Sequence, residues 1–216
     1  KGIAVGVVLH DLDQAAAVED IVEGLLEDLR HPDRGSTLVV QGNPGTGKTI
    51  IAIYLMKLLV DIRDFQHPDD IEPESMFAEF FVPENRALLK DLQMALVIPQ
   101  QSLRESVRRV FKRTPKLKPE MVLSPFQLGE SAESYDLVLV DETHRLNQRA
   151  NQASGVQNKK FTDINTALFG ADDPRYTQLD WIKARSTHQL LLIDGDQTVR
   201  PQDRKSTRLN SSHMSI

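Results

Sequence analysis

The chain has 216 residues, of which 40% are hydrophobic and 26% are charged, and it has no cysteine. These values are typical of a globular protein with a full hydrophobic core, and they exclude an intrinsically disordered chain, disulfides and cysteine-ligated metal sites. The net charge of −5 excludes a chain that is basic throughout. No apolar run is long enough for a membrane helix and no signal peptide is evident, so we expect a cytoplasmic protein without a membrane partner.

Five short apolar segments are predicted to be strands. Most of them are continuous runs of Val, Leu and Ile, the pattern of parallel strands that are buried on both faces. In chain order they are Leu38–Val40, Met94–Ile98, Met121–Leu123, Leu137–Val140 and Leu190–Ile193. Helical periodicity predicts helices at Asp13–Leu29, Thr49–Val60 and Ser102–Lys112, the last with Ser102 and Glu105 as a capping box. This alternation predicts a three-layer α/β domain with a mainly parallel central sheet.

Three segments depart from this pattern. His67–Glu84 is rich in proline and acidic residues and predicts a surface excursion, and the polar segment Arg145–Lys160 predicts a mobile loop. Residues 205–216 have no apolar periodicity and resemble a translated vector tail, so we expect them to be foreign to the fold. The predicted organisation is therefore a helical lead-in at 1–34, the α/β domain at 35–204 and this tail. The chain begins at Lys1, not Met, and we expect a longer natural protein.

A complete G-x-x-x-x-G-K-[ST] pattern follows the first predicted strand and opens a predicted helix, which is the setting of a phosphate-binding (Walker A) loop. Its residues are Gly42, Asn43, Pro44, Gly45, Thr46, Gly47, Lys48 and Thr49. Backbone N–H groups of such a loop converge on phosphates at the helix N-terminus. We predict that Lys48 contacts the β- and γ-phosphates and that Thr49 binds Mg²⁺ through its hydroxyl. The alternative, a glycine-rich turn with an exposed lysine, does not explain the flanking strand and helix.

Two carboxylates, Asp141 and Glu142, follow the predicted strand Leu137–Val140. In P-loop enzymes an acid at this place holds the Mg²⁺ shell, and a second group orients the attacking water. We assign Asp141 to the metal and Glu142 to the catalytic base. The alternative is an acidic strand end that caps the next helix. The glutamate favours hydrolysis over a purely switching role.

The segment Asp141–His144 resembles motif II, D-E-x-H, of helicase-like ATPases, and further segments follow in the order of superfamily 1 helicases. Asp11–Val18 is similar to the Q-motif, which implies that Gln14 contacts adenine. Asp194–Val199 resembles motif III, which implies that Gln197 senses the γ-phosphate. His144 is either a link between motifs II and III or an ordinary histidine at a helix start. Trp181 is expected in the core or at a partner, not stacked on a base.

The segment after Ile98 lies where motif Ia of these helicases contacts the nucleic-acid backbone. By this resemblance the contacts are made by Gln100, Ser102, Arg104 and Arg108. Residues 100–118 contain seven basic residues and one acidic residue, a local excess that suits phosphate binding in an acidic chain. A solvated basic helix face is the alternative.

The set of motifs is most similar to the Schlafen group 3 type DNA/RNA helicase domain, over roughly Gly35 to Arg204. The resemblance implies a RecA-like P-loop ATPase, the first motor domain of a superfamily 1 helicase-like protein, with ATP, Mg²⁺ and DNA or RNA, expected to be single-stranded, as ligands. It also implies a second RecA-like domain that supplies arginines to the site. We find no room for that domain after Val199, so we expect this chain alone to bind ATP and hydrolyse it slowly. Two alternatives are an AAA+-like ATPase that acts on a protein and a nucleotide-gated interaction module.

Overall fold

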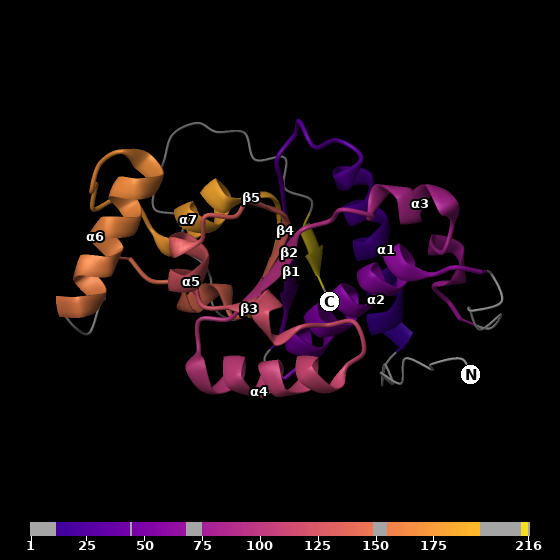
Figure 1. The fold of residues 1–216 in the computed structure, drawn as a ribbon. Coiled ribbons are helices and arrows are strands. Elements are labelled where there is room, and N and C mark those ends of the chain that lie inside the picture. The colour runs from indigo at the N-terminus through magenta and orange to yellow at the C-terminus, as the bar shows by residue number, and fades with distance from the viewer. Residues whose placement is uncertain (1–11, 44, 68–74, 149–154, 195–212, 216) are drawn as a thin grey trace.

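The computed structural model describes residues 12–43, 45–67, 75–148, 155–194 and 213–215. Its centre is a parallel sheet with the strand order β3-β2-β4-β5-β1-β6 (Figure 1). The strands are β1 (Ser36–Gly42), β2 (Met94–Val97), β3 (Val122–Leu123), β4 (Tyr135–Val140), β5 (Ser186–Asp194) and β6 (His213–Ser215). The five predicted strands therefore all exist, and the prediction of an α/β domain with a parallel sheet is confirmed.

Seven α-helices and three short 3₁₀-helices surround the sheet in the described part of the chain. The α-helices are α1 (Leu12–Leu29), α2 (Lys48–Asp64), α3 (Pro83–Leu88), α4 (Gln101–Arg113), α5 (Pro125–Glu130), α6 (Gly155–Phe169) and α7 (Gln178–Arg185). The 3₁₀-helices are η2 (Ala78–Phe80), η3 (Pro119–Met121) and η4 (Thr143–Arg145). Helices α1, α2 and α4 lie on one face of the sheet and α5 and α7 on the other, with α6 outside them (Figure 1).

Alternate residues of each strand enter two separate cores, as the continuous apolar runs predict. In β2, Met94 and Leu96 pack with α1, α2 and α4, whereas Ala95 and Val97 pack with α5 and α7. Trp181 is fully buried in a third, smaller cluster between α6 and α7. The three-layer arrangement follows because each face of the sheet is apolar and needs its own helical cover.

Three local predictions are corrected. The excursion His67–Glu84 is not wholly at the surface, because Phe77 and Phe80 are buried in the core beside α2. The predicted loop Arg145–Lys160 gives way to α6 at Gly155, and residues 149–154 lie outside the described part. Helix α4 begins one residue before Ser102, at Gln101, and its N-cap residue makes no side-chain capping bond, so the predicted capping box does not form.

Strand β6 pairs with β1 at the edge of the sheet and lies within the segment 205–216. The predicted foreign origin of that segment stays a prediction. The helices in the described part of the chain are too short or too polar to span a bilayer.

The strand order places β5 between β1 and β4, and the register brings Gly42 of β1 level with Asp194 of β5. Asp141 follows β4 on the other side of β5. Because the strands are parallel, all three carboxyl ends meet at one edge of the sheet. Ligands of open α/β sheets bind at this edge.

Candidate active site

The glycine-rich loop between β1 and α2 has backbone angles that most residues cannot adopt. Gly45 has φ 83° and Gly47 has φ 81°, both in the left-handed region, which costs glycine little because it has no Cβ. Gly47 is also the N-cap of α2 and gives no side-chain capping bond. The first N–H groups of α2 are thus left without a side-chain acceptor at the cap, which is a feature of anion-binding helix starts. Pro44, also predicted here, lies outside the described residues.

The side chain of Thr46 ties this loop together. The Thr46 hydroxyl donates to the carbonyl oxygen of Asn43 at 2.9 Å. A Cβ on Gly42 would lie 2.9 Å from the Thr46 hydroxyl oxygen, so a larger residue at position 42 would require the Thr46 side chain to shift. The loop is therefore closed by its own residues in addition to its attachment to β1 and α2.

Lys48 is held inside the loop, with only 8% of its side chain exposed. Its Nζ donates to the carbonyl oxygens of Gly42 at 2.9 Å and of Asn43 at 2.7 Å. It also forms an ion pair of 2.7 Å with the Asp194 carboxylate at the end of β5. A buried ammonium needs such partners, because desolvation without them is costly. The lysine thus connects β1, α2 and β5 at one point.

Thr49, in the first turn of α2, and Asp141, directly after β4, come together although β1 and β4 are not neighbours in the sheet. The Thr49 hydroxyl donates to the Asp141 carboxylate at 2.5 Å, and the Glu142 N–H donates to the other carboxylate oxygen at 2.9 Å. Burial raises the pKa of Asp141, while these two hydrogen bonds act in the opposite direction. A carboxylate that is 1% exposed and carries this desolvation cost gains from a nearby cation.

Glu142 adopts φ 52° and ψ 43°, a left-handed conformation that is rare for a residue with a side chain. Its Oε2 atom is 3.1 Å from Nε2 of His144 and 2.9 Å from Nε of Arg145. Backbone strain of this kind is common at functional sites, where the surrounding contacts hold it in place. Arg145 was not among the predicted site residues, because nothing in the motif indicates that the side chain folds back.

Asp194 is the second group that the sequence analysis did not place in the site. It pairs with Lys48, and single atoms of Asp194, Glu142 and His144 all lie within 4.8 Å of one another. The side chains of Lys48, Thr49, Asp141, Glu142 and Asp194 therefore form one continuous polar cluster. The pairing of Lys48 with Asp194 depends on the order of the strands, which the sequence does not display.

Two further predicted residues cannot be placed. Gln197 lies outside the described residues, and Gln14 belongs to α1 but its side chain is outside the described part. Their predicted contacts with the γ-phosphate and with adenine stay predictions.

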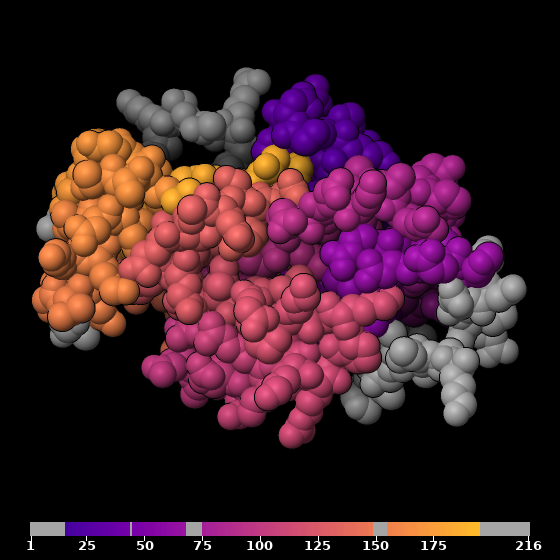
Figure 2. Space-filling view, in the orientation of Figure 1, coloured from indigo at the N-terminus to yellow at the C-terminus, as the bar shows by residue number. Residues whose placement is uncertain are grey.

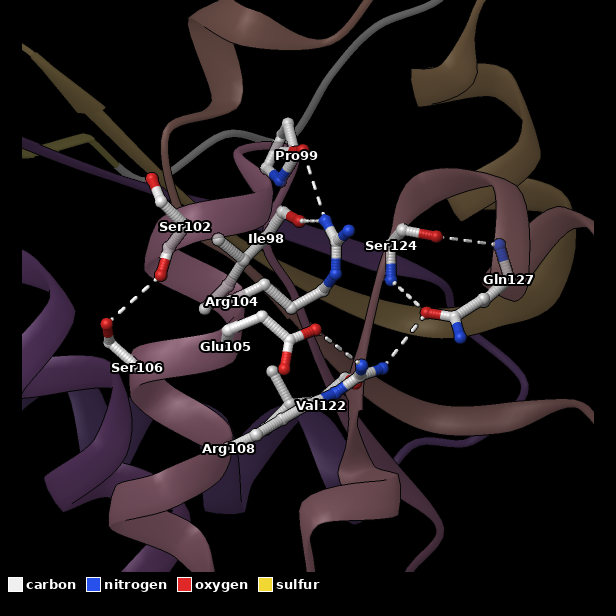
Figure 3. Close-up of polar contacts among 10 residues, drawn as sticks. All are labelled: Ile98, Pro99, Ser102, Arg104, Glu105, Ser106, Arg108, Val122, Ser124 and Gln127. Carbon is white, nitrogen blue, oxygen red and sulfur yellow. Dashed lines mark hydrogen bonds and ion pairs between the residues drawn. The ribbon is translucent and has the colours of Figure 1, made fainter. Parts of the chain in front are cut away.

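The predicted nucleic-acid contacts lie around the start of α4 (Figure 3). Gln100 is exposed and donates through Nε2 to the Ser102 hydroxyl at 3.1 Å. Arg104 turns inward, and its Nη1 donates to the carbonyl oxygens of Ile98 at 2.8 Å and of Pro99 at 3.1 Å. Burial lowers the pKa of Arg104. Its guanidinium thus supports the turn between β2 and α4.

Arg108 is engaged in the same manner (Figure 3). Its Nη2 donates to the carbonyl oxygen of Val122 at 2.8 Å and to Oε1 of Gln127 at 3.1 Å, and its Nη1 lies 3.2 Å from Glu105. These bonds tie α4 to β3 and α5. The exposed basic residues lie further along the chain, and they are Arg109, Lys112, Arg113, Lys116 and Lys118, of which Lys116 lies 3.5 Å from Asp61. Figure 2 shows α4 at the lower rim of the molecule.

The fold and this edge of the sheet define the class of the protein: it is a three-layer α/β domain of the RecA-like type. The chain belongs to the family described as the Schlafen group 3, DNA/RNA helicase domain, which matches residues 35–214. The resemblance found in the motifs is thereby confirmed. The match extends into the segment 205–216. No curated protein matches the chain.

Proposed function

We propose that this domain binds Mg-ATP at the carboxyl edge of the sheet, hydrolyses it, and couples this reaction to DNA or RNA. The observation that carries the proposal is the convergence of Lys48 and Thr49 from the start of α2 with Asp141 and Glu142 from the end of β4. Membership in a helicase-domain family supports the same conclusion. Each of these side chains has the chemistry that one step of ATP hydrolysis requires.

The loop supports a triphosphate. Left-handed glycines at 45 and 47 turn the backbone so that successive N–H groups can face an anion. The Lys48 ammonium is already desolvated, so a phosphate that replaced the Asp194 carboxylate would meet a strong, water-poor cation. Lys48 is assigned to the β- and γ-phosphates.

Thr49 and Asp141 would hold Mg²⁺, with the hydroxyl as a direct ligand and the carboxylate in the metal's shell. Oxygen donors of this kind suit Mg²⁺, which is bound by few protein groups together with water and phosphate. The bound ion would neutralise charge on the phosphates during the reaction. The raised pKa of Asp141 fits this assignment, because a neighbouring cation offsets the cost of its buried charge.

Glu142 is assigned to the attacking water. The water oxygen forms the new bond to the γ-phosphorus, the bond from that phosphorus to the β–γ bridging oxygen breaks, and ADP leaves with the bridging oxygen. The proton of the water passes to Glu142 or to the released phosphate. The protein forms no covalent bond with the transferred phosphoryl group. The rate of hydrolysis therefore depends on the positioning of water by Glu142 and on charge stabilisation by Lys48.

The nucleic-acid surface is assigned to the exposed cations of α4 and the segment after it. Three basic residues are exposed, namely Arg109, Lys112 and Arg113. By contrast, Arg104 and Arg108 donate hydrogen bonds to backbone carbonyl oxygens of the protein itself. Contacts to phosphates need mobile, solvent-facing cations and carry no sequence information. Gln100 and Ser102 stay in the proposed surface because both are exposed beside the carboxyl edge.

Single-turnover hydrolysis tests the proposal. The chain is held in excess over radiolabelled ATP with Mg²⁺, so that even slow turnover is visible, and single-stranded DNA or RNA is added at two salt concentrations. We expect slow hydrolysis that nucleic acid accelerates and that higher salt slows again. Glu142→Gln should lower the rate by about a hundredfold or more while ATP still binds.

The outcomes separate the candidate functions. Hydrolysis at the same rate with and without both polymers would favour the ATPase that acts on a protein, a possibility supported by the engagement of Arg104 and Arg108 within the fold. Binding without any hydrolysis would favour the nucleotide-gated module. An unchanged rate in Glu142→Gln would reject the assignment of the base.

A further inference from the structure

We infer that Arg145 is a positioning residue, which fixes the carboxylate of Glu142 so that one oxygen is presented to the attacking water. This inference rests on the proposed function and adds a residue to it. Arg145 lies outside the D-E-x-H pattern, and its role comes from its contacts alone.

Two side chains approach the same oxygen of Glu142. Arg145 donates through Nε to Oε2 at 2.9 Å, and His144 Nε2 lies 3.1 Å from that same atom. Among the described residues, Oε1 accepts no hydrogen bond from the protein. The hydrogen bond from Arg145, with His144 beside the same oxygen, restrains the rotation of the carboxylate and leaves the other oxygen available for water.

The backbone makes such support necessary. Glu142 begins the turn η4 in a left-handed conformation, so the strand that precedes it no longer determines where its side chain points. The Arg145 N–H donates to the Glu142 carbonyl oxygen at 2.8 Å, which closes the turn and brings the two side chains to the same side. The residue that closes the turn is thus also the residue that holds the carboxylate.

His144 is a limited support by itself. Its Nδ1 is buried and has no hydrogen-bond partner among the described residues. Donation from Nε2 to Glu142 requires the proton on Nε2, which leaves Nδ1 as a bare acceptor that nothing anchors. Arg145 always carries its charge and donates through a planar group, so it fixes direction where the histidine leaves freedom.

The pair is suited to orientation more than to stability. Arg145 is 53% exposed and Glu142 is 23% exposed, and ion pairs so accessible to water contribute little to folding. Removing the guanidinium should therefore leave the fold intact, and any loss of rate reports on the position of Glu142.

The test compares Arg145→Ala and Arg145→Lys in the single-turnover assay, with Lys160→Ala as the control. Lys160 forms an ion pair of similar exposure with Glu130, away from the site. We expect Arg145→Ala to lower the hydrolysis rate by about tenfold to a hundredfold, with the ATP dissociation constant within twofold of wild type. Arg145→Lys should recover part of the rate, and Lys160→Ala should match wild type.

A double variant shows whether Arg145 acts through Glu142. If it does, Glu142→Gln with Arg145→Ala hydrolyses no more slowly than Glu142→Gln alone, because the carboxylate to be positioned is already lost. A wild-type rate in Arg145→Ala, or a further full loss in the double variant, would overturn the inference while leaving the base assignment standing. An unchanged rate in Glu142→Gln, or no hydrolysis in wild type, would overturn the proposed function and this inference with it.

Discussion

Replacing Lys48 by Met and Asp194 by Asn, singly and together, measures how strongly the ion pair at the centre of the site holds the fold. The two groups lie 2.7 Å apart, with side chains 8% and 13% exposed. Either single change leaves a charge in a nearly dry place without its partner. The double change removes both charges and keeps side chains of similar size.

The magnitude follows from this burial. Removing one partner of a buried ion pair costs about 3–5 kcal/mol, and the position at the sheet edge indicates the lower end, about 3 kcal/mol for each single variant. For a chain of this length that loss corresponds to a melting temperature roughly 6–12 °C lower. The double variant should be more stable than the sum of the two losses predicts, by about 2 kcal/mol.

Urea unfolding followed by tryptophan fluorescence measures all four proteins, since the chain has a single tryptophan and Trp181 is fully buried. The slope of the free energy with urea should be the same in each, so that midpoints can be compared. Losses that add to within about 0.5 kcal/mol would show that Lys48 and Asp194 do not interact, and the description of the site would be wrong.

Three further predictions concern the same molecule. Burial lowers the pKa of His188 from its ordinary value of 6.5, so the unfolded chain binds a proton at this residue more readily than the folded chain. The free energy of unfolding should therefore fall as the pH drops below 6.5, and it should fall less in His188→Asn. The same dependence of this free energy on pH in both proteins would contradict the prediction. Asp141→Asn removes the charge of a buried carboxyl group whose pKa is raised, so at pH 7 the melting temperature should stay the same or rise. The same change should abolish Mg²⁺-dependent ATP binding. A clear drop in melting temperature would contradict the first expectation. Trp181→Phe deletes the 2.7 Å hydrogen bond from Nε1 to Asn165 Oδ1 and leaves space beside Phe161. The free energy of unfolding, measured in urea by circular dichroism, should fall by about 2–3 kcal/mol. A loss below about 0.5 kcal/mol would show that the cluster is loosely packed.

The sheet was predictable because its signal is local. Short apolar runs such as Leu137–Val140 are typical of buried strands, and the glycine-rich loop and the two acids follow such runs. Parallel pairing then requires the ends of the strands to share an edge, so the convergence of Thr49 and Asp141 could be expected from the sequence.

The parts that were not predicted depend on contacts between distant segments. Helix α6 starts in a polar stretch and buries Phe161, Ile164 and Asn165 against Trp181. Its apolar residues with helical spacing, Phe161, Ile164 and Leu168, all lie from the middle of the helix onward, so its first turns have no periodic signal.

The basic residues of α4 show the same limit at the level of side chains. The resemblance to motif Ia assigned Arg104 and not Arg109 to the nucleic acid, yet Arg104 donates to two backbone carbonyls and Arg109 is exposed. Only the turn that brings Ile98 and Pro99 beside α4 distinguishes them. A charge count therefore locates a basic segment but does not identify which of its cations are available to a ligand.

Equilibrium dialysis with radiolabelled ATP and Mg²⁺ tests the central claim, that the carboxyl edge of this sheet is a nucleotide site. Wild type, Lys48→Ala and the control Lys160→Ala are compared at a temperature where circular dichroism shows each of them folded. We predict one ATP bound per chain in wild type and in the control, and loss of that binding in Lys48→Ala. No binding by wild type, or equal affinity in Lys48→Ala, would contradict it.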